Sequence, residues 1–156
     1  MSREFFDEVD KALRGFLPPA LREFSARRTS GNLKVWYGDE DREHYEVQLM
    51  RGPKLEVGFH AEHKDADRNE AALGRLLDHE KAWRKALGPD PDAGPFLGRQ
   101  SSWRRVSEVW DLPGFNDDAS IEAAERLADY IRALEPLRAT KGRRPTARKA
   151  VRRSSG

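Results

Sequence analysis

The sequence contains no cysteine. This absence excludes disulfide bonds, thiol nucleophiles and zinc sites built from thiolates, and it suits a reducing compartment. Long hydrophobic runs are also lacking, because Glu4, Asp7, Glu8 and Asp10 interrupt the N-terminal segment. We therefore expect neither a signal peptide nor a membrane span, and we expect a cytoplasmic location.

The motifs of common enzyme and nucleic-acid-binding classes are missing as well. There is no HExxH pair, no phosphate-binding loop and no dinucleotide fingerprint. Ser101 and Ser102 lack the flanking glycines of a nucleophile elbow. No helix-turn-helix, zinc finger or ribonucleoprotein motif predicts base-specific recognition. The sequence favours a non-enzymatic protein without a cofactor.

Charge is abundant and unevenly distributed. Charged residues make up 36% of the 156 residues, against about 25% in typical domains. Residues 140–156 contain seven basic residues and no acid. These seven are Lys141, Arg143, Arg144, Arg148, Lys149, Arg152 and Arg153. The remaining 22 basic and 27 acidic residues give residues 1–139 a net charge of −5.

We interpret residues 1–139 as one folded domain and residues 140–156 as a disordered basic tail. Val151 is the only large apolar residue in the tail, too little to offset the entropy of ordering it. Basic tails bind nucleic-acid phosphates without sequence preference. Our leading hypothesis is a small bacterial-type accessory protein whose tail contacts nucleic acid. A solubilising tail, or one that binds an acidic protein or membrane surface, remains an alternative.

The hydrophobic pattern begins with helical spacing and then changes to alternation. Phe5, Val9 and Leu13 predict an N-terminal helix from Ser2, and Pro19–Ala26 resembles a second short helix. Three alternating runs follow and predict an antiparallel meander. Their inward residues are Leu33, Val35 and Tyr37; Tyr45, Val47 and Leu49; and Leu55, Val57 and Phe59.

The second half of the chain predicts two more helices and one more strand. A helix capped by Asp65 or Asp67 extends to Leu87, where Gly88 stops it. Residues 88–98 resemble an exposed loop, residues 101–112 a fourth strand, and residues 120–137 a final helix. The predicted fold class is α+β: a three- or four-stranded antiparallel sheet packed with N-terminal, middle and C-terminal helices.

Two histidines lie close together in the segment LEVGFHAEHKD, residues 55–65. A metal site needs three or four ligands within about 2.0 to 2.2 Å of one ion. His60, His63 and Glu62 could contribute, with a remote His44 or His79. Because HAEH matches no established zinc spacing, a solvated strand end followed by a helix cap is the simpler interpretation.

An enzymatic alternative starts from the element order, which resembles the core of restriction-endonuclease-like nucleases. That resemblance implies carboxylates that hold magnesium and a lysine that steadies the attacking hydroxide. Glu62 and Lys64 have the required spacing, with Asp41 upstream and Glu46 as a further acid. These four residues are the candidate catalytic set of this alternative.

A third hypothesis is a chaperone or adaptor that binds a protein partner through its sheet, because the element order is also similar to that of bacterial secretion chaperones. Under the nucleic-acid hypothesis, Trp36 and Trp103 are candidate stacking residues. Trp36 lies on the face opposite the predicted core. The sequence does not decide whether that face is exposed or covered.

Overall fold

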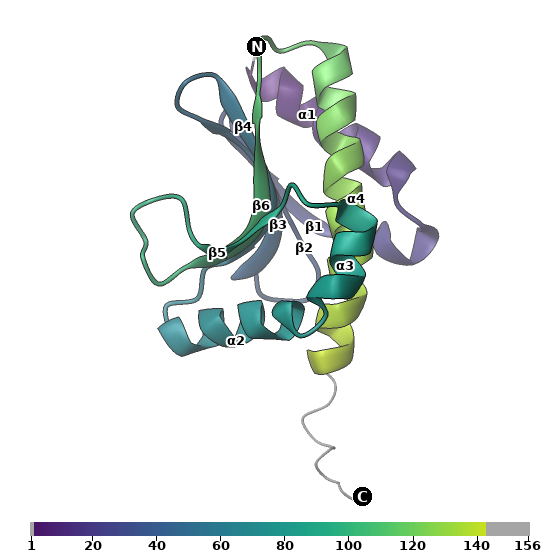
Figure 1. Cartoon of the computed structure of the whole chain (residues 1–156). Coiled ribbons are helices and arrows are strands. Elements are labelled where there is room, and N and C mark those ends of the chain that lie inside the picture. The colour runs from purple at the N-terminus through teal and green to yellow at the C-terminus, as the bar shows by residue number, and fades with distance from the viewer. Residues whose placement is uncertain (1, 143–156) are drawn as a thin grey trace, which may run out of the picture.

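The structure is a computed structural model that describes residues 2–142 of the chain (Figure 1). It is an α+β fold of one sheet and its flanking helices. The helices are α1 (Ser2–Phe16), α2 (Ala66–Leu77), α3 (Glu80–Leu87) and α4 (Asp117–Gly142), with a short 3-10 turn at Pro19–Leu21. The strands are β1 (Ser25–Arg28), β2 (Asn32–Trp36), β3 (Glu43–Met50), β4 (Lys54–Ala61), β5 (Asp92–Pro95) and β6 (Arg104–Asp111).

The sheet has six antiparallel strands in the order β1-β2-β3-β4-β6-β5. The prediction of three or four strands was therefore too low. The predicted helix at Pro19–Ala26 is also wrong, because it is replaced by the 3-10 turn and the start of β1. The loop predicted at residues 88–98 contains β5. Both missed strands have four residues and lie at the edges of the sheet, where hydrophobic alternation is weakest.

One face of the sheet carries the core, as the alternation predicts. Seven of the nine predicted inward residues are fully buried, and Tyr37 and Leu49 are partly buried against them. Helices α1 and α4 cover this face (Figure 1). Their buried stripes include Phe6 and Leu13 in α1 and Leu127 and Ile131 in α4. Burying these side chains is the main favourable contribution to folding.

The middle helix divides into α2 and α3 at Asp78 and His79. Asp65 caps α2 as predicted, since its side chain accepts a hydrogen bond from the backbone N–H of Asp67. The Trp83 indole of α3 donates to the Leu76 carbonyl at 2.8 Å and fixes the bend. Among the described helices, none combines the length and the apolar character needed to cross a bilayer.

Helix α4 extends from Asp117 to Gly142, beyond both ends of the predicted helix at residues 120–137. It therefore crosses the boundary that we predicted after Ala139, and Lys141 lies within its last turn. The other six basic residues of the predicted tail lie outside the described residues. The prediction of a disordered tail stays a prediction.

Candidate metal centre

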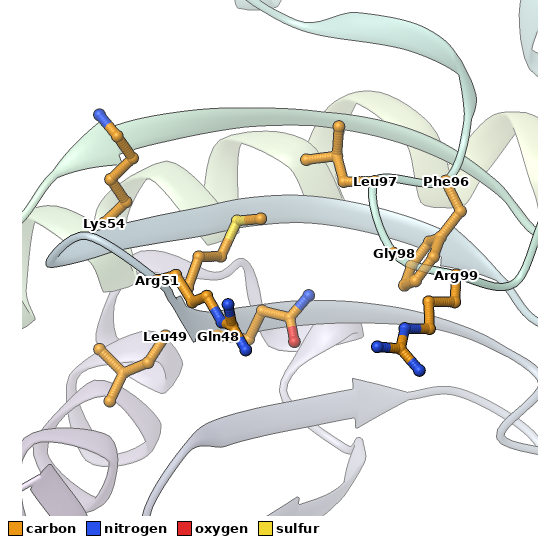
Figure 2. Close-up of a pocket in the computed structure, with 9 residues that line it drawn as sticks. Gln48, Leu49, Arg51, Lys54, Phe96, Leu97, Gly98 and Arg99 are labelled. Carbon is orange, nitrogen blue, oxygen red and sulfur yellow. The ribbon is translucent and has the colours of Figure 1, made fainter.

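The second face of the sheet is polar, yet its centre is buried. His44 and Glu46 of β3 and Glu56 and His60 of β4 are all less than 5% exposed. The loop between β5 and β6 lies over this face and carries Phe96 (Figure 2). The Phe96 ring contacts the His60 ring edge-on, with 5.0 Å between centroids. The expectation of a solvated strand end at His60 is therefore wrong.

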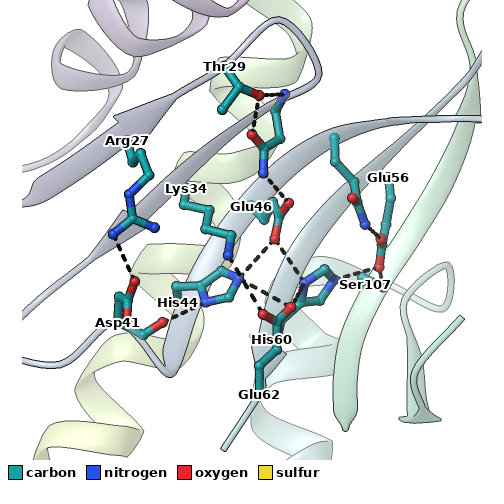
Figure 3. Close-up of polar contacts among 12 residues, drawn as sticks. Arg27, Thr29, Lys34, Asp41, His44, Glu46, Glu56, His60, Glu62 and Ser107 are labelled. Carbon is teal, nitrogen blue, oxygen red and sulfur yellow. Dashed lines mark hydrogen bonds and ion pairs between the residues drawn. The ribbon is translucent and has the colours of Figure 1, made fainter. Parts of the chain in front are cut away.

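Four of the polar side chains converge on one point (Figure 3). His44, Glu46, His60 and Glu62 each offer one ligand atom, and these atoms all lie within 4.8 Å of one another. His44 Nε2 lies 2.8 Å from Glu46 Oε1, and His60 Nδ1 lies 3.1 Å from the same oxygen. Glu62 Oε2 lies 3.1 Å from His60 Nδ1 and 3.6 Å from His44 Nε2.

These separations suit a small cation. Bonds of about 2.1 Å to a tetrahedral ion place the ligand atoms about 3.4 Å apart. The four neighbouring separations in the cluster are 2.8, 3.1, 3.1 and 3.6 Å. These four separations differ from about 3.4 Å by at most about 0.6 Å, and the two remaining separations lie within 4.8 Å, so shifts of the side chains would accommodate an ion between the two imidazoles and the two carboxylates.

The outer nitrogen of each histidine is fixed by an acceptor. His44 Nδ1 donates to the backbone carbonyl of Asp41 at 2.9 Å, and His60 Nε2 donates to Glu56 Oε2 at 2.8 Å. Each ring therefore turns its other nitrogen toward the centre, where it meets carboxylate oxygens. This is the orientation that outer partners impose on metal-binding histidines.

The carboxylates are positioned from outside in the same way. Glu46 accepts from the Asn32 amide at 2.8 Å, and Lys34 Nζ lies 3.7 Å from Glu62. Glu56, which supports His60, accepts from Ser107 and Gln48, each at 2.6 Å. The other oxygen of Glu46 and of Glu62 faces the centre of the cluster, where it contacts the two histidines.

The electrostatics depend on these contacts. Burial disfavours the charged form of Glu46, but its hydrogen bonds with His44 and His60 outweigh burial and hold its pKa far below the ordinary value. Burial likewise opposes a charge on His60, yet hydrogen bonds with three carboxylates raise its pKa well above 6.5. The pKa of Glu56 is lowered because its hydrogen bond with His60 and its other contacts outweigh burial. In the metal-free protein, this cluster thus stabilises positive charge at its centre.

The net charge of the surroundings matches a divalent ion. Glu46, Glu56 and Glu62 supply three negative charges, and Lys34 supplies one positive charge. Nearby, Arg105 pairs with Asp92 at 3.5 Å, so these two charges offset each other. With both histidines as neutral ligands, two negative charges remain for the ion to balance.

The structure brings together only some of the predicted site residues. Of the nuclease set, Glu46 and Glu62 meet at the cluster, whereas Asp41 pairs with Arg27 at 3.0 Å and Lys64 is exposed. Of the predicted metal ligands, His60 belongs to the cluster. His63 is buried elsewhere, with its Nε2 2.8 Å from Glu43.

Both predicted stacking tryptophans are partly buried, and each contacts a neighbouring side chain. Trp36 is partly buried, with the Arg27 guanidinium 5.2 Å from its ring centroid. Trp103 packs edge-on against Phe96, with 5.1 Å between centroids. Six of the seven predicted nucleic-acid-binding residues lie outside the described residues. Their positions relative to the two tryptophans are therefore not part of the structure.

The sequence predicts His44 only as a remote metal ligand, and Glu46 only as an acid of the magnesium-dependent nuclease set. A signal for both was present: the pattern His-x-Glu occurs at residues 44–46 and again at residues 60–62. In strands, residues two apart share a face, and the predicted hairpin brings the two strands together. In the structure, His44 and His60 are directly paired across β3 and β4.

Comparisons of the chain with protein-family models, with curated proteins and with solved structures found no match.

Proposed function

We propose that this protein binds one divalent transition-metal ion at His44, Glu46, His60 and Glu62. The convergence of four donor atoms within 4.8 Å supports this function best. Imidazole nitrogens suit zinc, iron, nickel and copper, whereas magnesium prefers an all-oxygen shell. Zinc accepts both donor types in tetrahedral geometry, so we take Zn²⁺ as the leading ion.

The arrangement favours an ion that is held rather than one that activates water. Structural zinc sites are closed by four protein ligands, whereas catalytic sites leave a position for water or substrate. Here four protein donors are available, and their side chains are at most 10% exposed. A role for the ion in stabilising the sheet therefore fits better than metal-dependent hydrolysis.

Zinc binding is tested with untagged protein that has been stripped with a chelator and dialysed against Zn²⁺. The wild-type protein is expected to retain one equivalent by elemental analysis. His44→Ala and His60→Ala are each expected to weaken binding by about 100-fold or more, because each removes a donor atom of the ion. Circular dichroism checks that both variants are folded.

The matched control is His63→Ala, since His63 is also a buried histidine beside a glutamate but lies outside the cluster. It is expected to retain one equivalent of zinc. Wild-type protein without bound zinc would contradict the proposal. The proposal would also be contradicted if His63→Ala lost as much bound zinc as His60→Ala.

As a second candidate function, we propose that the basic C-terminal segment binds nucleic acid without sequence preference. The supporting observation is the charge difference between residues 140–156, with seven basic residues and no acid, and the acidic remainder of the chain. Such binding releases counterions and weakens as salt rises.

The test replaces the six basic residues beyond Gly142 by glutamine in the full-length chain, which leaves α4 unchanged. Fluorescence anisotropy with labelled DNA and RNA is expected to show at least about tenfold weaker binding, with a shallower salt dependence. The control replaces an equal number of exposed basic residues within residues 2–138. If the tail variant and the wild-type protein bound DNA and RNA with equal affinity, the tail would not be the nucleic-acid-binding segment.

A further inference from the structure

A groove lies next to the candidate metal centre, because two of its lining residues, Gln48 and Phe96, contact Glu56 and His60; Figure 2 shows the residues that line it. It has a volume of about 560 Å³, which is within the range of small-molecule sites. The turn between β3 and β4 forms one side, and the loop between β5 and β6 forms the other. Gln48–Arg51 and Lys54 line the first side, and Phe96–Arg99 line the second.

The groove is lined by cations and by no carboxylate. Arg51 and Arg99 are exposed, and within residues 2–142 neither has a side-chain partner. In Figure 2, their side chains extend from the two sides of the groove, with Gln48 between them. Lys54 pairs with Asp111 at 2.8 Å, so it contributes less positive charge. Two guanidinium groups are thus available to an anion, and guanidinium suits carboxylate and phosphate.

Apolar side chains line the groove as well. Among the lining residues, Leu97 is 42% exposed, and Met50 and Phe96 are partly buried. A hydrated inorganic ion would gain nothing from these side chains. A ligand with both an apolar body and a negative group would use all of them.

We propose that the groove binds a small organic anion in which a carboxylate or phosphate group is attached to an apolar body. Arg51 and Arg99 hold the charged group, and Leu97 and Met50 contact the apolar part. The chemistry is shared by carboxylates and phosphate esters, so the choice between them is an outcome of the test.

The groove is physically connected to the candidate metal centre. Phe96 lines the groove and packs on His60, and Gln48 donates to Glu56, which accepts from His60 Nε2. The anion proposal nevertheless does not rest on metal binding, because none of the groove's cationic residues belongs to the four-residue cluster. Titrations of chelator-treated protein therefore test the groove separately.

The experiment is isothermal titration calorimetry with phenyl phosphate and benzoate as probes, and with benzyl alcohol and inorganic phosphate as comparisons. At least one aromatic anion is expected to bind. Arg51→Gln and Arg99→Gln are each expected to weaken that binding by about tenfold, because each removes a charge-assisted hydrogen bond. The tighter of the two probes identifies the preferred charged group.

The matched control is Arg42→Gln. Arg42 is an exposed arginine that immediately precedes β3, at the opposite end of the strand from Arg51, and it does not line the groove. This variant is expected to bind like wild type. The proposal is overturned if neither aromatic anion binds or if Arg42→Gln weakens binding as much as Arg51→Gln. Equal affinity for benzyl alcohol or inorganic phosphate would likewise overturn it.

Discussion

Replacing Gly58 by alanine is expected to lower the free energy of unfolding by about 3 kcal/mol or more. Gly58 lies in the middle of β4 with a φ of +154°, a conformation that side chains rarely adopt. An added Cβ atom would lie 2.5 Å from Ser107 Cα and too close to the Val106 carbonyl oxygen. These are backbone atoms of the paired strand β6, so they cannot move aside without disturbing the sheet.

Urea denaturation followed by circular dichroism measures this loss. The control is Gly15→Ala in α1, where an added Cβ atom meets nothing within 4 Å. That substitution should stabilise the protein by roughly 0.5 to 1 kcal/mol, because alanine favours a helix more than glycine does. A Gly58→Ala variant as stable as wild type would disprove the close approach of β4 and β6.

Sequence alternation predicted three of the six strands, β2, β3 and β4, whereas the length and the bounding loops of residues 101–112 favoured β6 as a fourth. In β3 and β4, apolar residues alternate with polar ones over at least six positions, and the predicted inward residues lie in the core. The edge strands β1 and β5 have no such alternation: SARR is polar, and DAGP contains glycine and proline. Their pairing depends on the neighbouring strands, which a local pattern does not describe.

The candidate site was predictable in part. Alternation assigns Glu46 and His60 to the face opposite the core, and the hairpin makes β3 and β4 neighbours. Alternation does not show that the loop carrying Phe96 covers this face, since Phe96 and His60, whose rings are in contact, lie 36 positions apart in sequence. Nor does it explain Gly58, whose lack of a side chain brings Ser107 of β6 close enough for its hydroxyl to support Glu56.

Removing the bound ion is expected to lower the melting temperature by about 10 °C. Zinc at about 1,000 times its dissociation constant stabilises the folded state by about 4 kcal/mol. Each kcal/mol corresponds to about 2 to 4 °C in a domain of this size. Differential scanning calorimetry with zinc or with a chelator measures the difference. The melting temperature of His63→Ala should differ between zinc and chelator as much as that of wild type. The melting temperature of His44→Ala should be the same under both conditions.

Glu62→Gln separates a metal centre from a purely structural network of ion pairs. With zinc present, this variant is expected to melt well below wild type, because the ion loses one carboxylate ligand. With a chelator present, it is expected to melt only slightly below wild type, because the loss of the Glu62 contacts with His60 and His44 is partly offset by the removal of one of three neighbouring buried negative charges. Lys34, which is 24% exposed, also loses a partner. If the carboxylate served only to pair with the histidines, the substitution would destabilise the protein equally under both conditions. A loss of melting temperature that is clearly larger with zinc than with the chelator therefore identifies the cluster as a site that its ion completes.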